Sequence, residues 1–206
     1  MARVVFLGTP RYGVPALEAL VAHHQVLAVM TQPDRPTGRG RHLAAPPVKE
    51  VALAHGIEIL QPRSLRRDRE VVARLGELGA EVFVLAAFGQ ILRADILGIP
   101  PHGVIGLHAS LLPRWRGAAP VAAAILHGDR ETGVTLMRTD EGMDTGDIIA
   151  QRAVPIAADD TRESLTEKLS QLAADLLIEK LPDWLAGRIT PSPQDDASAT
   201  YAPQLE

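Results

Sequence analysis

Two short segments carry side chains that could do chemistry together. The first holds His108, which directly follows an apolar run, and the second is an acidic, glycine-containing turn that includes Asp144. A histidine facing a carboxylate suits acyl transfer to an amine, because the acyl oxygen gains negative charge and the amine must lose a proton. An imidazole can stabilise that charge, and a nearby carboxylate can favour the protonated ring and relay the proton. This chemistry requires neither a metal nor a covalent intermediate.

Each segment also has an ordinary structural interpretation. A histidine at a strand end is often structural, and an acidic turn with glycines is often a plain hairpin loop. A calcium loop would need a longer series of ligands that ends in glutamate. The loop at residues 8–10, Gly-Thr-Pro, lacks the G-x-G-x-x-G pattern of dinucleotide-binding loops, and the other histidines show no metal-ligand spacing. We therefore expect no metal site.

Strands and helices are expected to alternate along the first half of the chain. Residues 4–7 and 82–86 are apolar at every position, as in strands that are covered on both faces of a parallel sheet. This order predicts a doubly wound, Rossmann-like α/β fold with a mostly parallel sheet flanked by helices. Strands are expected at residues 3–8, 26–31, 57–60, 82–86 and 104–107, and helices at 14–22, 47–55 and 68–77.

The second half follows a different pattern. Strands at 134–138 and 148–154 are separated by a Gly- and Asp-rich loop, which predicts an antiparallel extension of the sheet near 134–154. A last helix begins at a capping-box pattern at 160–163. From Gly187 onward the composition is too polar to bury much apolar surface, which predicts a catalytic domain at 1–186 and a linker or tail at 187–206. The segments with His108 and Asp144 then follow strands at the edge where such folds bind ligands.

Composition limits the possible partners. The chain has no cysteine, and no apolar stretch approaches the ~18 residues of a membrane span, so we expect a cytoplasmic protein without a membrane role. A net charge of -4 argues against a surface that is basic everywhere. Contact with nucleic acid must then be local, and the concentrated basic segment is a loop expected to be mobile. That loop carries Arg35, Arg39, Arg41 and His42, and its ordinary interpretation is a solvated surface loop.

The order of these motifs from Val4 to about Ala186 resembles the folate-dependent formyltransferases. Residues 31–36, 38–40 and 112–120 are similar to the methionyl-tRNA formyltransferases in particular. The resemblance implies 10-formyltetrahydrofolate as formyl donor and the α-amino group of methionyl initiator tRNA as acceptor. It also implies a monomer.

The resemblance assigns expected roles to individual residues. His108 matches the family's catalytic histidine, and Asp144 matches its catalytic aspartate. The loop that ends at His42 matches an insertion that meets the acceptor end of tRNA, which favours binding over the solvated-loop interpretation. Tetrahydrofolate is expected at Ser110, Leu111, Leu112 and Pro113, with the pterin near Ala86, Ala87, Phe88, Gly89 and Asp140.

Two departures from the family pattern affect these expectations. The family has an asparagine two residues before the histidine, where it is expected to hold the formyl oxygen, and this chain has Gly106. Loss of one such donor typically costs ~3 kcal/mol of transition-state stabilisation. The family also continues past residues 201–203 into a smaller β-barrel domain, so we expect an excised catalytic domain or a short homologue. The alternatives are a formyltransferase for another amine, such as an amino-sugar nucleotide, and a folate-binding module without turnover.

Overall fold

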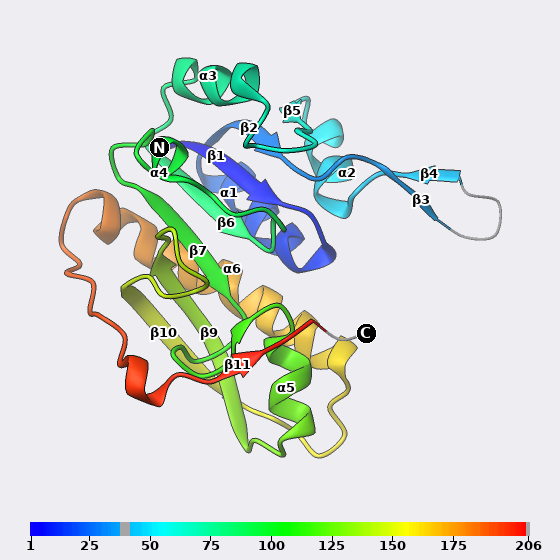
Figure 1. Cartoon of the computed structure of the whole chain (residues 1–206), viewed down its shortest axis with the longest axis vertical. Coiled ribbons are helices and arrows are strands. Elements are labelled where there is room, and N and C mark those ends of the chain that lie inside the picture. The colour runs from blue at the N-terminus through cyan, green and yellow to red at the C-terminus, as the bar shows by residue number, and fades with distance from the viewer. Residues whose placement is uncertain (38–41, 205–206) are drawn as a thin grey trace. The chain divides into compact units, whose positions relative to one another are not determined.

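The computed structural model describes residues 1–37 and 42–204 (Figure 1). The chain divides into two compact units, Met1–Val104 and Ile105–Glu206. The expected α/β fold class is confirmed, with mainly parallel strand pairs in the first unit and mainly antiparallel pairs in the second.

The first unit is built on parallel strands. β1 (Arg3–Gly8) pairs on one side with β2 (Gln25–Met30) and on the other with β6 (Val82–Ala86), and β2 also pairs with β5 (Glu58–Leu60). Four of the five residues of β6 are buried, as its uninterrupted apolar run predicts. The core between the sheet and its helices contains Val5, Leu7, Met30, Leu75, Phe83 and Ile96.

The helices of the first unit lie close to where the pattern predicts them. They are α1 (Val14–His23), α2 (Pro47–Ala54), α3 (Arg69–Glu77) and the short α4 (Ala94–Leu97), with a 3-10 turn, η1, at Arg11–Gly13. Proline occupies the first turn of α1 and α2, where its missing N–H would have no partner in any case.

An antiparallel strand pair replaces part of the expected mobile loop. β3 (Arg35–Thr37) pairs with β4 (His42–Ala44), and Figure 1 shows the pair reaching away from the sheet of its unit. The prediction of a mobile loop is therefore wrong for the residues of β3 and β4. Residues 38–41 lie outside the described part of the chain.

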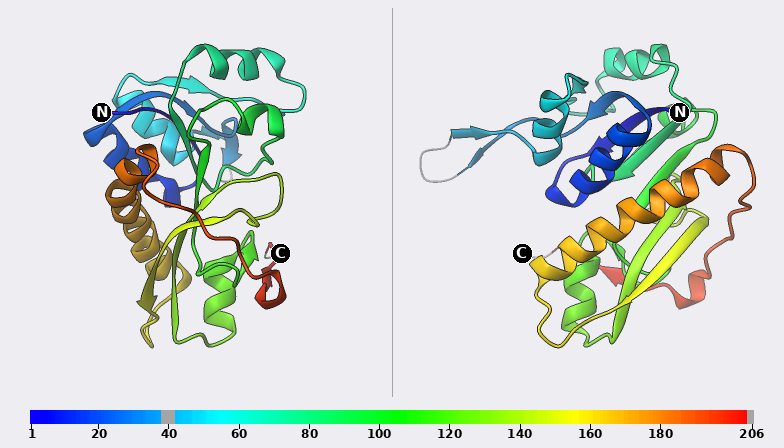
Figure 2. Two further views of the ribbon diagram at one scale, coloured as in Figure 1. Left: turned by 90° about the vertical axis from the view of Figure 1, so that its left-hand side faces the viewer. Right: turned by 180° about the vertical axis from the view of Figure 1, so that it is seen from behind.

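The second unit contains the predicted antiparallel strands. β9 (Glu131–Arg138) pairs with β7 (Val104–His108) on one side and with β10 (Ile148–Pro155) on the other. The long helix α6 (Arg162–Leu185) contacts both β9 and β10, and Figure 2 shows it running along them. Thr161 caps α6 through a capping box that it forms with Ser164, and Leu165, Leu169 and Leu176 are buried.

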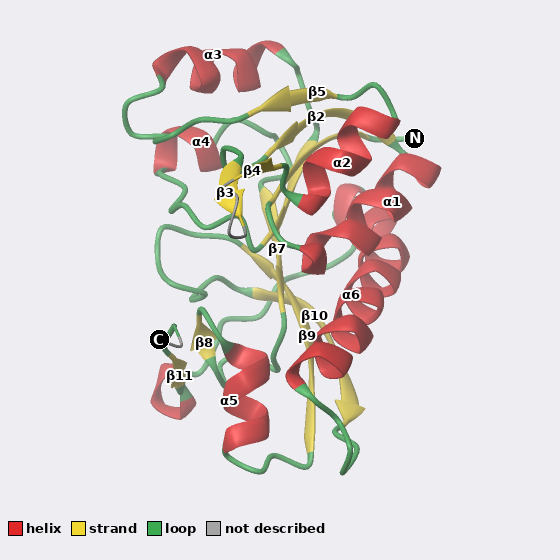
Figure 3. Cartoon of the chain, turned by 90° about the vertical axis from the view of Figure 1, so that its right-hand side faces the viewer, coloured by secondary structure: helices red, strands yellow, loops and turns green. Residues whose placement is uncertain are grey.

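The prediction of a linker or tail is wrong for residues 187–204. Ser192 pairs with Ile148, a 3-10 turn, η2, forms at Asp196–Ser198, and β11 (Tyr201–Ala202) pairs in parallel with β8 (Arg116–Gly117). Figure 3 shows β8 and β11 beside α5 (Pro120–Leu126). The composition of this segment concealed its order because polar side chains and backbone groups attach most of it to the second unit, and among its described residues Ala202 alone joins the buried cluster of Trp115, Ala123 and Ala124.

Within the described residues, no helix is both long enough and apolar enough to cross a membrane.

Candidate active site

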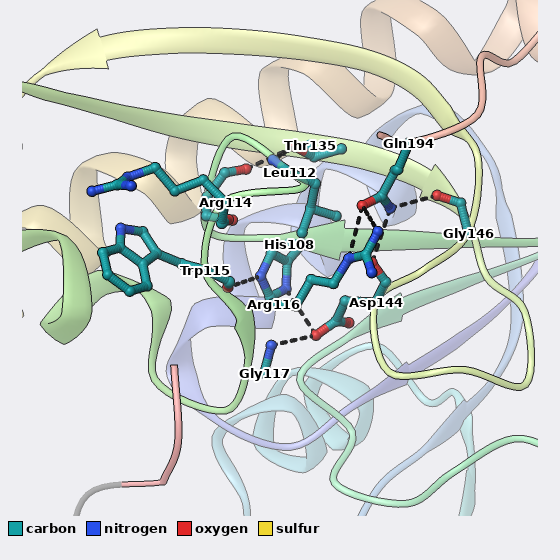
Figure 4. Close-up of polar contacts among 11 residues, drawn as sticks. His108, Leu112, Arg114, Trp115, Arg116, Gly117, Thr135, Asp144, Gly146 and Gln194 are labelled. Carbon is teal, nitrogen blue, oxygen red and sulfur yellow. Dashed lines mark hydrogen bonds and ion pairs between the residues drawn. The ribbon is translucent and has the colours of Figure 1, made fainter. Parts of the chain in front are cut away.

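His108 is the last residue of β7, and its side chain is almost completely buried. Its Nε2 lies 2.9 Å from the Trp115 carbonyl oxygen (Figure 4). A carbonyl oxygen can only accept, so Nε2 carries a hydrogen and donates it. In the neutral ring, Nδ1 is therefore the nitrogen with a free lone pair. Nδ1 is thus the atom that can accept or return a proton.

Asp144 faces Nδ1 from the loop between β9 and β10. Its Oδ2 lies 3.7 Å from His108 Nδ1, which is ion-pair range but too long for a direct hydrogen bond. The same Oδ2 accepts a hydrogen bond of 2.8 Å from the Gly117 backbone N–H. The Gly117 N–H therefore holds the carboxylate beside the imidazole, but the carboxylate forms no direct hydrogen bond with Nδ1.

Two residues that contact the His108 ring have left-handed backbones. Trp115 has φ 60° and Asp144 has φ 55°, and among the described residues of the second unit they are the two non-glycine residues with positive φ. Such conformations are unfavourable for L-residues and persist only where surrounding contacts enforce them. Their coincidence at one imidazole marks this place as a candidate functional site.

The Asp144 loop is attached to the polar C-terminal segment. Gln194 Nε2 donates to the Asp144 carbonyl at 2.9 Å and to the Gly146 carbonyl at 2.7 Å. Gln194 Oε1 accepts from Nε and Nη2 of Arg116 at 3.0 and 2.8 Å (Figure 4). Arg116 Nη2 also donates to Asp196 Oδ1 at 2.7 Å. Arg116 is 2% exposed, so its guanidinium is an internal part of this network.

Trp115 is fixed through its indole as well as its backbone. Indole Nε1 donates to Asp129 Oδ2 at 2.8 Å, and the Arg114 guanidinium lies 4.4 Å above the ring centroid. Arg114 also donates two hydrogen bonds to Asp129, and this pairing lowers the pKa of the Asp129 carboxyl. The Trp115 backbone N–H donates to Thr200 Oγ1. The carbonyl that orients His108 therefore belongs to a residue held on three sides.

Residues 2–181 match the formyl transferase family over most of the chain. The chain belongs to the formyl transferase family.

Relatives of known name agree with this family. The chain is 52% identical to a methionyl-tRNA formyltransferase of Halorhodospira halophila over 99% of its own length and 66% of that protein. It is 52% identical to one of a Roseiflexus species, over 98% of the chain and 63% of that protein. The chain thus spans just under two thirds of the curated relatives it matches. The fold is shared with glycinamide ribonucleotide transformylase 1 from Symbiobacterium toebii, with a TM-score of 0.76, 23% identity and 95% of each chain covered.

The segment predicted to bind the formyl transferase's folate follows His108 directly and is held by side chains of β9 and β10. The Leu112 N–H donates to Thr135 Oγ1 at 3.0 Å, and Gln151 Nε2 donates to the Leu112 carbonyl at 2.8 Å. Ser110 Oγ donates to the Arg114 carbonyl. Leu111 and Pro113 are partly exposed, whereas Ser110 and Leu112 are buried. The second unit therefore brings this segment, His108 and Asp144 together.

Asp140 lies at the start of the same loop and organises it internally. Its carboxylate accepts hydrogen bonds from Thr145 Oγ1 and from the Gly142 N–H. A hollow of about 270 Å³ is lined by Asp140 together with Arg138, Thr139, Gly146 and Asp147.

The remaining predicted site residues belong to the first unit. Ala86 ends β6, Ala87 has φ 50°, and the Phe88 carbonyl accepts from Thr9 Oγ1 and Gln32 Nε2. The loop that includes Gly89 is therefore fixed by the ends of neighbouring strands. Arg35 is exposed on β3 and His42 begins β4, whereas Arg39 and Arg41 lie outside the described residues.

Gly106 lies two residues before His108 on β7, as its place in the sequence requires. A Cβ atom added to Gly106 would lie 2.9 Å from both Met137 Cε and Thr139 Oγ1. Thr139 Oγ1 is buried and has no hydrogen-bond partner within the described part of the chain. Space at this position is therefore already occupied by two side chains that belong to or follow β9.

Sequence reasoning missed Gln194, Arg116 and Asp196. Arg116 lay within the stretch used for the family resemblance, but no functional role was assigned to it. Gln194 and Asp196 fell in the presumed tail, where no periodicity or motif distinguishes them. Among the described residues, no group of His, Cys, Asp and Glu could hold a metal ion.

Proposed function

We propose that this chain carries the formyl-transfer site of a methionyl-tRNA formyltransferase. The reaction moves a formyl group from 10-formyltetrahydrofolate to the α-amino group of methionyl initiator tRNA. The observation that carries the proposal is the His108–Asp144 arrangement, in which Nδ1 faces a carboxylate 3.7 Å away while Nε2 is committed to a carbonyl.

The transfer makes two demands that this arrangement suits. The amine nitrogen first bonds to the formyl carbon, which places negative charge on the formyl oxygen, and the bond from that carbon to the donor nitrogen then breaks. A protonated Nδ1 of His108 can donate to that oxygen, because Nε2 keeps its own hydrogen on Trp115. A proton leaves the amine nitrogen and one reaches the donor nitrogen, and Asp144 can hold the proton or stabilise the charged imidazole during that exchange.

The donor is proposed to bind along residues 110–113 and near Asp140. These residues follow β7 or begin the Asp144 loop, so a ligand held by them would meet His108. The pterin is proposed to lie near Ala86–Gly89, whose carbonyl and left-handed turn are fixed within the first unit. The tRNA acceptor end is proposed to meet the basic residues 35–42.

A formylation assay with methionyl initiator tRNA and 10-formyltetrahydrofolate tests the proposal. We expect formylmethionyl-tRNA from the parent chain and a loss of at least about 10²-fold in kcat for His108→Ala, because the main side-chain donor is removed. Asp144→Asn keeps the shape of the side chain and is expected to lose rate as well. His55→Ala and Asp159→Asn change an exposed histidine and an exposed aspartate and serve as matched controls.

Parallel assays separate this proposal from its alternatives. Faster formylation of a nucleotide-linked amino sugar than of methionyl-tRNA would contradict the acceptor. Binding of a non-transferable folate analogue, measured by calorimetry, without formylation of either acceptor would favour a folate-binding module. No heat at millimolar analogue would contradict the folate assignment itself.

A further inference from the structure

Asp144 has a left-handed backbone, and the hydrogen bonds inside its loop run from Thr145 and Gly142 to Asp140 rather than to the Asp144 peptide. Its φ of 55° is unfavourable for a residue with a Cβ, and its neighbour Met143 is exposed. A strained residue of this kind stays in place only when other contacts determine its position. The Gly117 N–H holds the carboxylate end of Asp144, so a second contact must fix its backbone.

Gln194 supplies that second contact from fifty residues farther along the chain. Its single amide nitrogen donates to the carbonyls of Asp144 and Gly146, at 2.9 and 2.7 Å, and so spans the turn on either side of Thr145. Both N–H groups of the amide are thereby used on two carbonyls of one loop. This geometry fixes the direction of the Asp144 peptide, and with it the direction in which the side chain leaves the backbone.

Arg116 fixes the orientation of the Gln194 amide. An amide can flip and exchange its oxygen and nitrogen, but Arg116 only donates, so it requires the oxygen on its side and the nitrogen on the side of the loop. Arg116 is itself almost fully buried and bound to Asp196, and its neighbour Gly117 holds the Asp144 carboxylate. The short strand β8 therefore acts on Asp144 in two ways. Gly117 holds its carboxylate directly, and Arg116 acts on its backbone carbonyl through Gln194.

We propose that Gln194 is a positioning residue for the candidate catalytic carboxylate, and that Arg116 keeps its amide in the effective orientation. The inference rests on the proposed formyl transfer for its kinetic consequence, but its structural core is independent of that function. Gln194 holds the Asp144 peptide so that Oδ2 stays beside His108 Nδ1 without forming a direct hydrogen bond. It is expected to act on the rate of the reaction rather than on the affinity for either substrate.

The test replaces the Gln194 amide in two different ways. Gln194→Glu keeps an oxygen for Arg116 but turns the donor toward the loop into an acceptor that faces two carbonyls. Gln194→Met is neutral and of similar length, and it removes both the donor to the loop and the oxygen that accepts from Arg116, without adding charge. Gln204→Glu makes the same chemical change at an exposed position of the same segment and is the matched control.

Two readouts are measured on the full chain. The first is the NMR resonance of the His108 imidazole, which reports the carboxylate beside it and needs no turnover. We expect it to move in both Gln194 variants toward its position in Asp144→Asn, and not in Gln204→Glu. The second is formylation, in which kcat is expected to fall about 10-fold or more while both KM values stay within about 3-fold. In Gln194→Glu, kcat is expected to recover partly at acid pH, because a protonated carboxyl can again donate to one carbonyl.

An unmoved His108 resonance in both Gln194 variants would overturn the proposal, whatever the activity. If the His108 resonance moves in the Gln194 variants but the parent chain does not formylate methionyl-tRNA, the positioning role is supported and the proposed function is contradicted. If Gln194→Met lowers both kcat and the thermal midpoint while Gln194→Glu leaves kcat unchanged, Gln194 only stabilises the fold.

Discussion

At the scale of single residues, His108 and Asp144 meet through one nitrogen and one oxygen. Because Trp115 occupies Nε2, every exchange between the two side chains passes through Nδ1. We therefore expect the two residues to act as a unit. The alanine variants His108→Ala and Asp144→Ala should be strongly non-additive, with the second removal costing much less than the first. Single-turnover formylation by both single variants and the double variant measures this coupling, and full additivity would assign independent roles to them.

Gly106 gives a second prediction at this scale. Asparagine at this position should raise turnover by about 10², if an added amide donor reaches the formyl oxygen. Its Cβ would meet Met137 Cε and Thr139 Oγ1 at 2.9 Å, so the variant should also lose about 1–3 kcal/mol of stability through overpacking. Gly106→Ala shares the Cβ but has no amide and should lose stability without gaining rate. Urea unfolding and kcat measured on both variants check the prediction, and a rate gain in Gly106→Ala would contradict the donor role.

At the scale of elements, the start of α6 depends on one carboxylate. Lys168, the Ser164 hydroxyl and the Ala157 N–H all donate to Asp160 and lower the pKa of its carboxyl to about 2. Unfolded aspartate titrates near 3.9, so Asp160 stabilises the fold above about pH 4, and this contribution is lost as pH falls through about 2. Asp160→Asn should lower the thermal midpoint at pH 7 and have little effect near pH 2. The neighbouring exposed Asp159→Asn is the control, and a pH-independent effect of Asp160→Asn would contradict this account.

Elements differed in how well the sequence indicated them. β1 and β6 were predicted to the residue because buried parallel strands read as unbroken apolar runs. α5 and the pair β3–β4 were missed, since seven residues of helix and three-residue strands are too short to show a period. The positions of His108 and Asp144 followed from strand ends, but the partners of Asp144 did not. Gln194 reaches its loop by side-chain hydrogen bonds, which leave no pattern in local composition.

At the scale of the whole molecule, net charge determines which residues could attract the phosphates of tRNA. With a net charge of -4, attraction to phosphates must come from local cations, and residues 35–42 concentrate them. Replacing Arg39 and Arg41 with alanine should weaken tRNA binding and reduce the slope of log affinity against log salt by about 2. Replacing the exposed Arg66 and Arg67 with alanine makes the same change of charge elsewhere and should have a smaller effect. Filter binding over a salt series measures both, and equal slopes for the two variants would contradict a role of residues 35–42 in binding tRNA.

The hydrogen bond from Gln194 to the Asp144 loop also has a consequence for timing. A ribosome adds about 5–20 residues each second, and Gln194 is made fifty residues after Asp144. For roughly 3–10 s β7 and the Asp144 loop exist without the amide that binds this loop. The nascent chain can thus form its sheet before its carboxylate is set beside the imidazole. The Asp144 loop gains its contact with Gln194 only when the segment that carries Gln194 has emerged and docked.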